Sequence, residues 1–564
     1  MIKRINKNEI IAKSLPYLIF AVVIILILGY QIRSKTAIFV SDGYFHYSRF
    51  YDAAQQIKLH NFSFFQTNWG FDQSGRIINA MYGPYFAYFM GFVLLICGSW
   101  FKFQIITTFL ISLLAATGIY KCLQKVSDNQ EINVLISLIY LTSINLWSNG
   151  STFNSISSAI IPYVLYCGLR MIQNSKNQIN PLQLAVIISL VAQIHVLSTV
   201  LAIILLIPFF VYGLVITKNA KKLLLNLLLA IVITIFLTSN VWFNLFYFHS
   251  EEVVANPVAV NMYKATISLK RFVPLSLVLM LLQFIFVCTH FKQSKVNTFL
   301  TILSLAFFIF GSKLFPWNIV QNAFPILKEA FQMPRRFFIL VVPLYLLAVG
   351  ITLKKIKFEK KTFNILIYSS LCLVFLNNYA HISRINHFYT VNSLMTATKE
   401  NRGQKLASSS HDLGQLFNYL NVSAPDYLPQ SKNKIPNKRL SKLYKKQVIK
   451  RKDKFTHQVL SDGQLKIKWT AKNNKKVILP LVMYKHSILI VNNKKLVSVL
   501  KTGIGAPIVK QKIGNNEALL SYDQPKNWMP ILIINWLAWL ITFFLVICKY
   551  LKYKSFLKKN NENR

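Results

Sequence analysis

Acidic residues are scarce in this chain. Asp and Glu number 18 among 564 residues, against 64 Lys and Arg, which gives a formal net charge of +46. A soluble protein this basic would suggest nucleic acid, but here Lys and Arg mostly flank apolar segments. Membrane topology and anionic lipid explain that placement more simply. We therefore predict a membrane-lipid partner and no nucleic-acid partner.

Cysteine is also scarce, and its positions exclude two kinds of site. All six cysteines lie in or beside apolar segments, and none has metal-ligand spacing. The polar stretch from about 380 to 527 has none, so a disulfide framework is excluded there. The sequence also lacks a Walker loop, a dinucleotide glycine fingerprint and a nucleophile elbow. These absences disfavour an ATP-driven pump and, for a transferase, point to a donor carried by lipid.

Apolar residues, in contrast, make up 54% of the chain and recur in long runs. Runs of about 17–20 residues suit helices that cross a hydrocarbon core of about 30 Å. The segment 84–100 is ambiguous, but every loop on the inner side is basic only if it does not span. We therefore predict a re-entrant or juxtamembrane element there and about twelve spans. The predicted spans are 15–32, 103–122, 132–148, 155–172, 182–198, 199–217, 222–241, 272–290, 297–311, 337–353, 362–378 and 529–548.

The fold class is therefore a polytopic α-helical membrane protein with an extracytoplasmic C-terminal α+β or β-sandwich domain. Residues 1–379 form the membrane domain, whose outer acidic loop spans 38–82. Residues 380–527 form the extracytoplasmic domain, with helix and loop over 390–436 and a β-rich part over 454–527. Residues 528–564 form a last span and a basic cytoplasmic tail. We expect the chain to lie in a bacterial plasma membrane, with both termini on the cytoplasmic side.

Turn pairs divide the β-rich part into short strands. Short runs of alternating apolar and polar residues, such as KFTHQVLSDGQLKIKWTA and SILIVNNKKLVSVL, indicate strands of a small antiparallel sandwich. The expected turns are Asp462-Gly463, Asn492-Asn493 and Asn515-Asn516.

The acidic loop 38–82 holds the main candidate site. Asp42, His46 and Arg49 recur at i, i+4 and i+7, so they would share one face of a short surface helix. A carboxylate near a bilayer is costly unless it is paired, hydrated or functional. Asp42 is thus a candidate general base or metal ligand, the alternative being a solvated loop acid, and His46 is a second catalytic candidate. Asp52 could be only a salt-bridge partner, and Asp72 is a candidate substrate-binding residue.

Two further candidates lie outside this loop. His195 sits inside the apolar run LVAQIHVLSTV, where two helices must meet because 181–217 is too long for one span. At that outer hinge it could reach a site, the alternative being a satisfied core histidine. Glu251 and Glu252 follow an aromatic stretch and could bind a metal or act as an acid, although a hydrated loop explains them equally well.

The pair Arg335-Arg336, in FQMPRRFFIL, precedes a span on its outer side. The positive-inside rule disfavours arginine there. A phosphate held at the lipid surface would explain the pair, because a guanidinium matches it with two hydrogen bonds. Contact with lipid headgroups is the alternative, and Lys313 could assist.

These residues resemble a known family. An acid after the first span, a following His and Arg, a Tyr-x-Pro element and a late Pro-Arg-Phe loop resemble C-type (GT-C) membrane glycosyltransferases. More closely, the chain is similar to bacterial membrane proteins called "6-pyruvoyl-tetrahydropterin synthase-related" and to their YfhO-like relatives. Its late segments LPLVMY, VNNKKL and EALLSYDQP resemble the outer β-domain of those proteins. The chain lacks the His-rich zinc site of a pterin synthase. The matching residues are Asp42, His46, Arg49, Tyr82, Pro84, Pro334, Arg335, Arg336 and Phe337.

The resemblance implies an inverting transfer of a sugar from a polyprenyl-phosphate donor to a cell-envelope glycan or polymer on the outer face. Asp42 would be the base or, with Glu251 and Glu252, a ligand of Mg or Mn. Arg335 and Arg336 would hold the donor phosphate, with Arg49 and Tyr82 among the substrate-binding residues. A donor-making synthase and a flippase would be partners. The alternatives are a transporter or flippase, which calls for charged residues at mid-span, and a non-catalytic assembly factor for a lipid-linked glycan.

Overall fold

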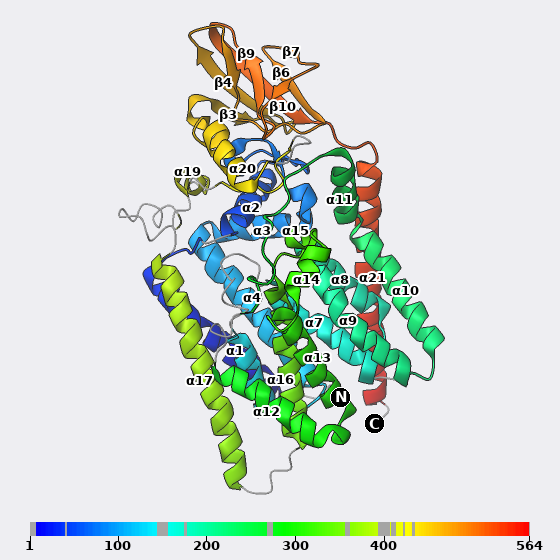
Figure 1. Ribbon diagram of the computed structural model, residues 1–564. Coiled ribbons are helices and arrows are strands. Elements are labelled where there is room, and N and C mark those ends of the chain that lie inside the picture. Colours follow the sequence, from blue (N-terminus) through cyan, green and yellow to red (C-terminus); the bar gives the residue numbers. More distant parts are fainter. Residues whose placement is uncertain are drawn as a thin grey trace.

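The structure is a computed structural model that describes residues 7–39, 42–143, 156–173, 178–267, 274–355, 361–392, 407, 413–420, 423–430 and 435–562. It has two parts, a long bundle of helices and a strand-rich region stacked on one end of that bundle (Figure 1). The first helix begins and the last helix ends toward the opposite end of the bundle (Figure 1).

Among the described residues, eight helices are long and apolar enough to cross a membrane. They are α1 (Lys7–Ser34), α4 (Trp100–Leu123), α7 (Ile156–Gln173), α9 (Val196–Ile216), α10 (Ala220–Leu237), α16 (Phe338–Lys355, preceded by the 3-10 turn η6, Pro334–Phe337), α17 (Lys361–Asn392) and α21 (Trp528–Glu562). Five apolar helices are shorter: α3 (Pro84–Cys97), α5 (Gln130–Leu141), α8 (Pro181–Ile194), α12 (Pro274–His290) and α13 (Lys295–Gly311).

Each segment that the sequence predicts to span lies on one of these helices, so the chain is a polytopic helical protein. Residues 144–148, 155, 272 and 273 of the predicted spans lie outside the described residues. The 84–100 segment forms α3, one of the shorter helices. The count of about twelve spans stays a prediction.

Burial separates a central helix from peripheral ones. In α16, 89% of the most apolar 18-residue window is buried inside the protein, whereas in α10 and α21 the buried share is 17%. Apolar side chains such as Leu540 and Phe543 of α21 therefore point away from the protein. An apolar surface of that extent is typical of helices that face lipid.

The helix α17 is longer than the sequence indicates. It continues to Asn392, so the boundary predicted at 380 lies inside a helix. Most of the predicted helix-and-loop part over 390–436 lies outside the described residues. Within it, α19 (Gln415–Leu420) falls in the segment SSSHDLGQLFNYL, which the sequence predicts as helical.

The predicted strand-rich part is present and antiparallel. One sheet has the order β3 (Thr456–Val459), β4 (Leu465–Ala471), β10 (Gly514–Tyr522), β6 (Ser487–Val491) and β7 (Lys494–Lys495). The other has the order β5 (Lys476–Ile478), β9 (Pro507–Lys510) and β8 (Leu500–Lys501). Buried side chains of β4, β6, β9 and β10 form one apolar core, which the two sheets share.

Two of the three predicted turns join strands. Asp462-Gly463 lies between β3 and β4, and Asn492-Asn493 joins β6 to β7 with both residues at positive φ, as in a type I′ hairpin. The third prediction is wrong. Asn515 and Asn516 lie within β10, opposite Thr470 and Trp469. The side chain of Asn516 bonds back to the main chain of Lys512 at 2.7 and 2.9 Å, so it supports the turn from inside the strand.

The acidic loop is folded between the two parts of the molecule. It contains α2 (Gly43–Lys58), β1 (Gln66–Thr67), β2 (Arg76–Ile77) and the 3-10 turns η1 (Phe71–Gln73) and η2 (Asn79–Met81). The predicted short surface helix is wrong, because α2 has 16 residues and His46, Arg49 and Asp52 on it are buried. It packs closely on α3, where a Cβ added to Gly91 would lie 2.7 Å from the nitrogen of Ala54.

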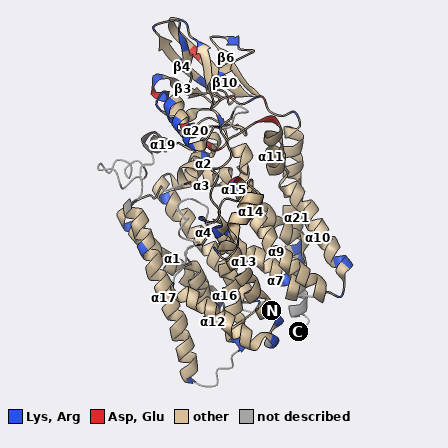
Figure 2. Ribbon diagram, viewed as in Figure 1, with Lys and Arg blue, Asp and Glu red and all other residues tan. Residues whose placement is uncertain are grey.

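A second apolar cluster joins the strand-rich region to the acidic loop and the helices. It includes Phe65 and Ile77 of the loop, Phe248 of α11 (Ser239–Glu251), Tyr484, and Trp528 of α21. Figure 2 shows Lys and Arg on the strand-rich region and at helix ends, with few charges along the helices. The acidic loop therefore lies where an apolar bundle meets a basic cap.

Candidate functional site

The corner at Tyr82-Gly83 brings several predicted residues together. From α2, Arg49 Nη2 donates to the carbonyl oxygens of Tyr82 at 2.7 Å and Gly83 at 3.4 Å, and Nε donates to Asn79 Oδ1 at 3.0 Å. Gly83 has φ +68°, and an added Cβ would lie 2.0 Å from the carbonyl oxygen of Gln193. Only glycine fits this close approach, which sets the corner against the end of α8.

His195 occupies the predicted hinge. It ends α8 and begins α9, with extended backbone at φ −161°. Its Nδ1 accepts from the backbone N–H of Ser198 at 3.2 Å, so in the neutral ring the proton is on Nε2. The ring centre lies 5.9 Å from that of Tyr82. His195 thus caps α9 and also borders the corner.

His46 lies behind the Tyr82 ring. The two ring centres are 5.6 Å apart, and Nδ1 of His46 is 3.4 Å from Nη1 of Arg49. Burial, with a contribution from Arg49, lowers the pKa of His46 well below its ordinary value. His46 is therefore neutral at pH 7, and since Arg49 can only donate, Nδ1 is the acceptor.

Asp42 and Arg336 approach Tyr82 from two other segments. Asp42 is exposed and immediately precedes α2. Arg336 is half-buried on η6 and donates from Nη2 to Gln332 Oε1 at 3.3 Å. Burial raises the pKa of Tyr82 to about 12, Arg49 opposes that shift, and Asp42 and Arg336 act on it with opposite signs. Charges from two parts of the chain, the start of α2 and η6, therefore act on the phenol.

The predicted arginine pair divides between two roles. Arg336 interacts with Tyr82 and with Asp42. Arg335 is exposed, and its Nη2 lies 3.0 Å from the sulfur of Met333. The two side chains therefore have different surroundings, and Arg336 is the one that borders the cluster.

The sequence reasoning missed Asp426 and Tyr427. The Tyr427 ring centre lies 6.3 Å from that of Tyr82 and 6.2 Å from that of Phe45. Burial raises the pKa of Asp426, Arg76 lowers it and Asp42 raises it slightly, so the charges of Arg76 and Asp42 both act on this carboxylate. A scarce acid in the turn sequence APDYLP was the available signal.

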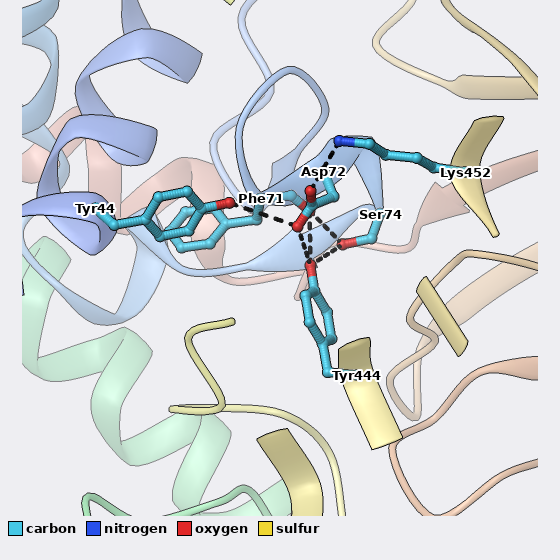
Figure 3. Close-up of polar contacts among 6 residues, drawn as sticks. All are labelled: Tyr44, Phe71, Asp72, Ser74, Tyr444 and Lys452. Carbon is cyan, nitrogen blue, oxygen red and sulfur yellow. Dashed lines mark hydrogen bonds and ion pairs between the residues drawn. The ribbon is translucent and has the colours of Figure 1, made fainter. Parts of the chain in front are cut away.

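Asp72, a candidate substrate-binding residue in the sequence, is buried among an ion pair and hydrogen bonds (Figure 3). Its carboxylate is 1% exposed, lies 3.1 Å from Lys452 Nζ and accepts from the hydroxyls of Tyr444 at 3.4 Å and Tyr44 at 3.5 Å. Tyr444 ends α20 (Asn437–Tyr444), and Lys452 begins η8 (Lys452–Lys454). Asp72 thus fastens the acidic loop and α2 to the chain that leads into the strands.

Asp52 is held by hydrogen bonds. Its Oδ1 accepts from the backbone N–H groups of Asn68 and Trp69 at 2.8 Å each and of Gly70 at 3.3 Å. Oδ2 accepts from Gln56 at 2.7 Å. These bonds shape the loop after α2, so within the described residues Asp52 acts through them and not through the salt bridge considered above.

The structure does not bring the predicted metal ligands together. Glu251 pairs with Lys485 Nζ and lies 3.4 Å from His486 Nε2, while Glu252 accepts from the backbone N–H of Lys485. In the described part of the chain, no three His, Cys, Asp or Glu side chains form a group that could hold a metal ion. Asp42, Glu251 and Glu252 therefore do not make one ligand set among the described residues, and a bound Mg or Mn stays a prediction.

Lys313 lies beside an aromatic ring, with Nζ 5.5 Å from the ring centre of Tyr263.

The residues around Tyr82 form one cluster, which we call the Tyr82 cluster. It consists of Asp42, His46, Arg49, Tyr82, His195, Arg336, Asp426 and Tyr427. It combines carboxylates that can accept a proton, cations that can hold an anion, and aromatic faces.

No protein-family model matches the chain, and no curated protein matches it.

Proposed function

We propose that this protein is a GT-C-type glycosyltransferase. It transfers a sugar from a polyprenyl-phosphate donor to a cell-envelope glycan on the outer face of a bacterial plasma membrane. One arrangement carries the proposal: next to an apolar bundle, the Tyr82 ring lies 5.9 Å from that of His195, and the charges of Asp42 and Arg336 act on its hydroxyl. Ionisable groups gathered in this way are more typical of a functional site than of packing alone.

Arg336 is the proposed ligand of the donor phosphate. Its guanidinium is half-buried at the start of α16, where an anion at the lipid surface would meet it. The Nε2 proton of His195 offers a second donor close to the same ring of Tyr82. Both groups would stabilise negative charge as it develops on the leaving phosphate.

Asp42 is the proposed general base. Its exposed carboxylate takes the proton of an acceptor hydroxyl while that oxygen forms a bond to the anomeric carbon of the donor sugar. The bond from this carbon to the phosphate oxygen breaks, and its electron pair leaves with the phosphate. Attack on the face opposite the leaving group inverts the configuration.

Apolar surface next to the arginines suits a polyprenyl chain. The segment between α13 and η6 exposes Leu314, Ile319, Phe324 and Ile326, each at least 61% accessible. This segment includes the short helices α14 (Trp317–Ala323) and α15 (Leu327–Ala330). Burying such side chains against an isoprenoid would contribute roughly 25 cal/mol for each Å² of apolar surface. The donor itself would come from a synthase and a flippase.

The test is the composition of the cell-envelope glycan in a strain that lacks the protein. The strain is complemented with wild type, with Asp42→Asn, or with Asp462→Asn as a control acid in a β-turn. We expect one sugar decoration to disappear, and wild type and the control to restore it while Asp42→Asn does not. Full restoration by Asp42→Asn would contradict the proposal. Loss of the decoration with the lipid-linked sugar confined to the inner leaflet would favour the flippase instead.

A further inference from the structure

The turn Pro425–Leu428 has an unusual backbone. Leu428 N donates to the carbonyl oxygen of Pro425 at 3.3 Å, and Tyr427, at the third position, has φ +62°. Glycine or asparagine normally occupies that position, because a side chain there is strained. Such strain persists only where the surroundings hold it, and it is common at functional sites.

Three separate parts of the chain hold this turn. Arg76 of the acidic loop donates from its two terminal nitrogens to the carbonyl oxygens of Ala424 and Asp426. After α11, the main chain of Ala255 exchanges hydrogen bonds of 3.0 and 2.7 Å with Tyr427 N and the carbonyl oxygen of Leu428. Tyr484 of the strand-rich region donates to the carbonyl oxygen of Tyr427 at 3.0 Å.

Every one of these bonds goes to the main chain of the turn. Arg76 in particular binds the carbonyl oxygen of Asp426 and not its carboxylate. The clamp therefore fixes the backbone and does not require an acid at 426. An asparagine at this position would keep the same backbone bonds and would remove the negative charge, which acts on Arg76 as well as on the Tyr82 cluster.

The side chains of the turn face the Tyr82 cluster. The Tyr427 ring lies against those of Tyr82 and Phe45, and Asp426 interacts with Asp42. Asp426 and Tyr427 are both half-buried. Two carboxylates repel each other, and the buried Arg76 guanidinium offsets this repulsion for Asp426, so the fold can hold two of its 18 acids at one cluster.

We propose that Asp426 and Tyr427 form the subsite for the acceptor, a carbohydrate or polyol with adjacent hydroxyl groups. Asp426 accepts a hydrogen bond from one hydroxyl while the neighbouring hydroxyl donates its proton to Asp42. The ring of Tyr427 covers the C–H face of the acceptor. This inference rests on the proposed function, because it assigns the partner substrate of the same reaction.

The first test compares wild type with Asp426→Asn in a transfer assay with polyprenyl-phosphate sugars. The acceptor is glycan from the deletion strain, which lacks the added sugar. Losing a hydrogen bond to a charged group should raise KM for the acceptor by about tenfold to a hundredfold. KM for the donor should stay unchanged, and the unfolding temperature should fall only slightly, because Arg76 keeps its bonds to the two carbonyl oxygens. Asp453→Asn, in η8, is the matched control. An unchanged acceptor KM, or a rise in donor KM alone, would overturn the inference.

A binding assay separates this inference from the proposed function. Fragments of the same glycan are titrated, without donor, into wild type, Asp426→Asn and Tyr427→Gly. Glycine tolerates the positive φ at 427, so that variant removes the ring without straining the turn. Weaker binding by both variants supports an acceptor subsite even if no sugar is transferred, in which case only the proposed transferase fails. Equal binding by all three proteins, or none by wild type, overturns the subsite.

Discussion

The guanidinium of Arg49 lies 4.5 Å from the centre of the Tyr82 ring and donates to the carbonyl oxygen of the same residue. Its partners in the described structure are Asn79, two carbonyl oxygens, a ring and the imidazole of His46, and none of them is a carboxylate. Burial lowers the pKa of Arg49 to about 10, so it stays charged at pH 7. Arg49 is therefore committed to positioning Tyr82, whereas the sequence predicts that it binds substrate.

Replacing Arg49 by Lys should destabilise the protein. Lysine cannot reach Asn79 and both carbonyl oxygens at once, because it lacks the planar fork. We expect a loss of about 2–4 kcal/mol in the free energy of unfolding, from two or so charge-assisted hydrogen bonds. Thermal unfolding in detergent measures it, with Arg335→Lys at an exposed site as the control. Equal shifts in the two variants would contradict this assignment.

Gly83 and Gly98 form a matched pair for testing the corner. Both have positive φ, +68° and +70°, but an added Cβ meets Gln193 at 2.0 Å in the first and nothing within 4 Å in the second. Gly98→Ala should cost only the backbone strain, about 1–2 kcal/mol. Gly83→Ala must also push the corner away from α8, so it should lower both the unfolding temperature and any transfer activity much further. Similar behaviour of the two variants would show that the corner can relax.

The ion pair of Asp72 and Lys452 predicts a pH-dependent defect. Lys452→Met would leave a carboxylate that is 1% exposed without its cation, at a cost of about 3–5 kcal/mol. Burial already raises the pKa of Asp72, and losing Lys452 raises it further. The folded variant then binds a proton more readily than the unfolded chain does, so its stability rises as pH falls.

Unfolding temperatures of wild type and Lys452→Met between pH 8 and pH 4 give the test. The difference between them should be large at high pH and should shrink as the medium becomes acidic. Lys466→Met is the control, since Lys466 pairs with Glu517 at 2.7 Å in a more exposed position. That variant should lose at most about 1 kcal/mol. A deficit of Lys452→Met that does not change with pH would argue against a buried Asp72 charge.

Local patterns predicted much of this structure. Apolar runs located the helices, and the length of 181–217 located the break at His195, because both depend on residues close in sequence. The burial of α2 was missed, since it depends on distant partners such as Phe417, whose ring lies 5.6 Å from that of Tyr44. The same limit hid Asp426 and Tyr427, which reach the Tyr82 cluster only through the fold. The turn predicted at Asn515-Asn516 was wrong because asparagine usually lies in turns. Here the Asn516 side chain lies in a strand and supports the neighbouring turn through hydrogen bonds.

His46 gives a last prediction. Here a lower pH decreases the stability of the folded protein, whereas it increases the stability of Lys452→Met. Burial and Arg49 keep its folded pKa far below the value of about 6.5 expected in the unfolded chain. Below that pH the unfolded chain takes up a proton that the folded protein refuses, so this group lowers stability progressively as pH falls. His46→Phe removes the titration while keeping a ring against Tyr82 and Phe50. Its stability between pH 7 and pH 5 should therefore fall less steeply than that of wild type, as measured by thermal unfolding.

The control is a substitution of an exposed histidine, His249→Phe, whose stability should follow that of wild type. If His46→Phe has the same slope as wild type, His46 is not a buried neutral group, and its contact with Arg49 needs another explanation.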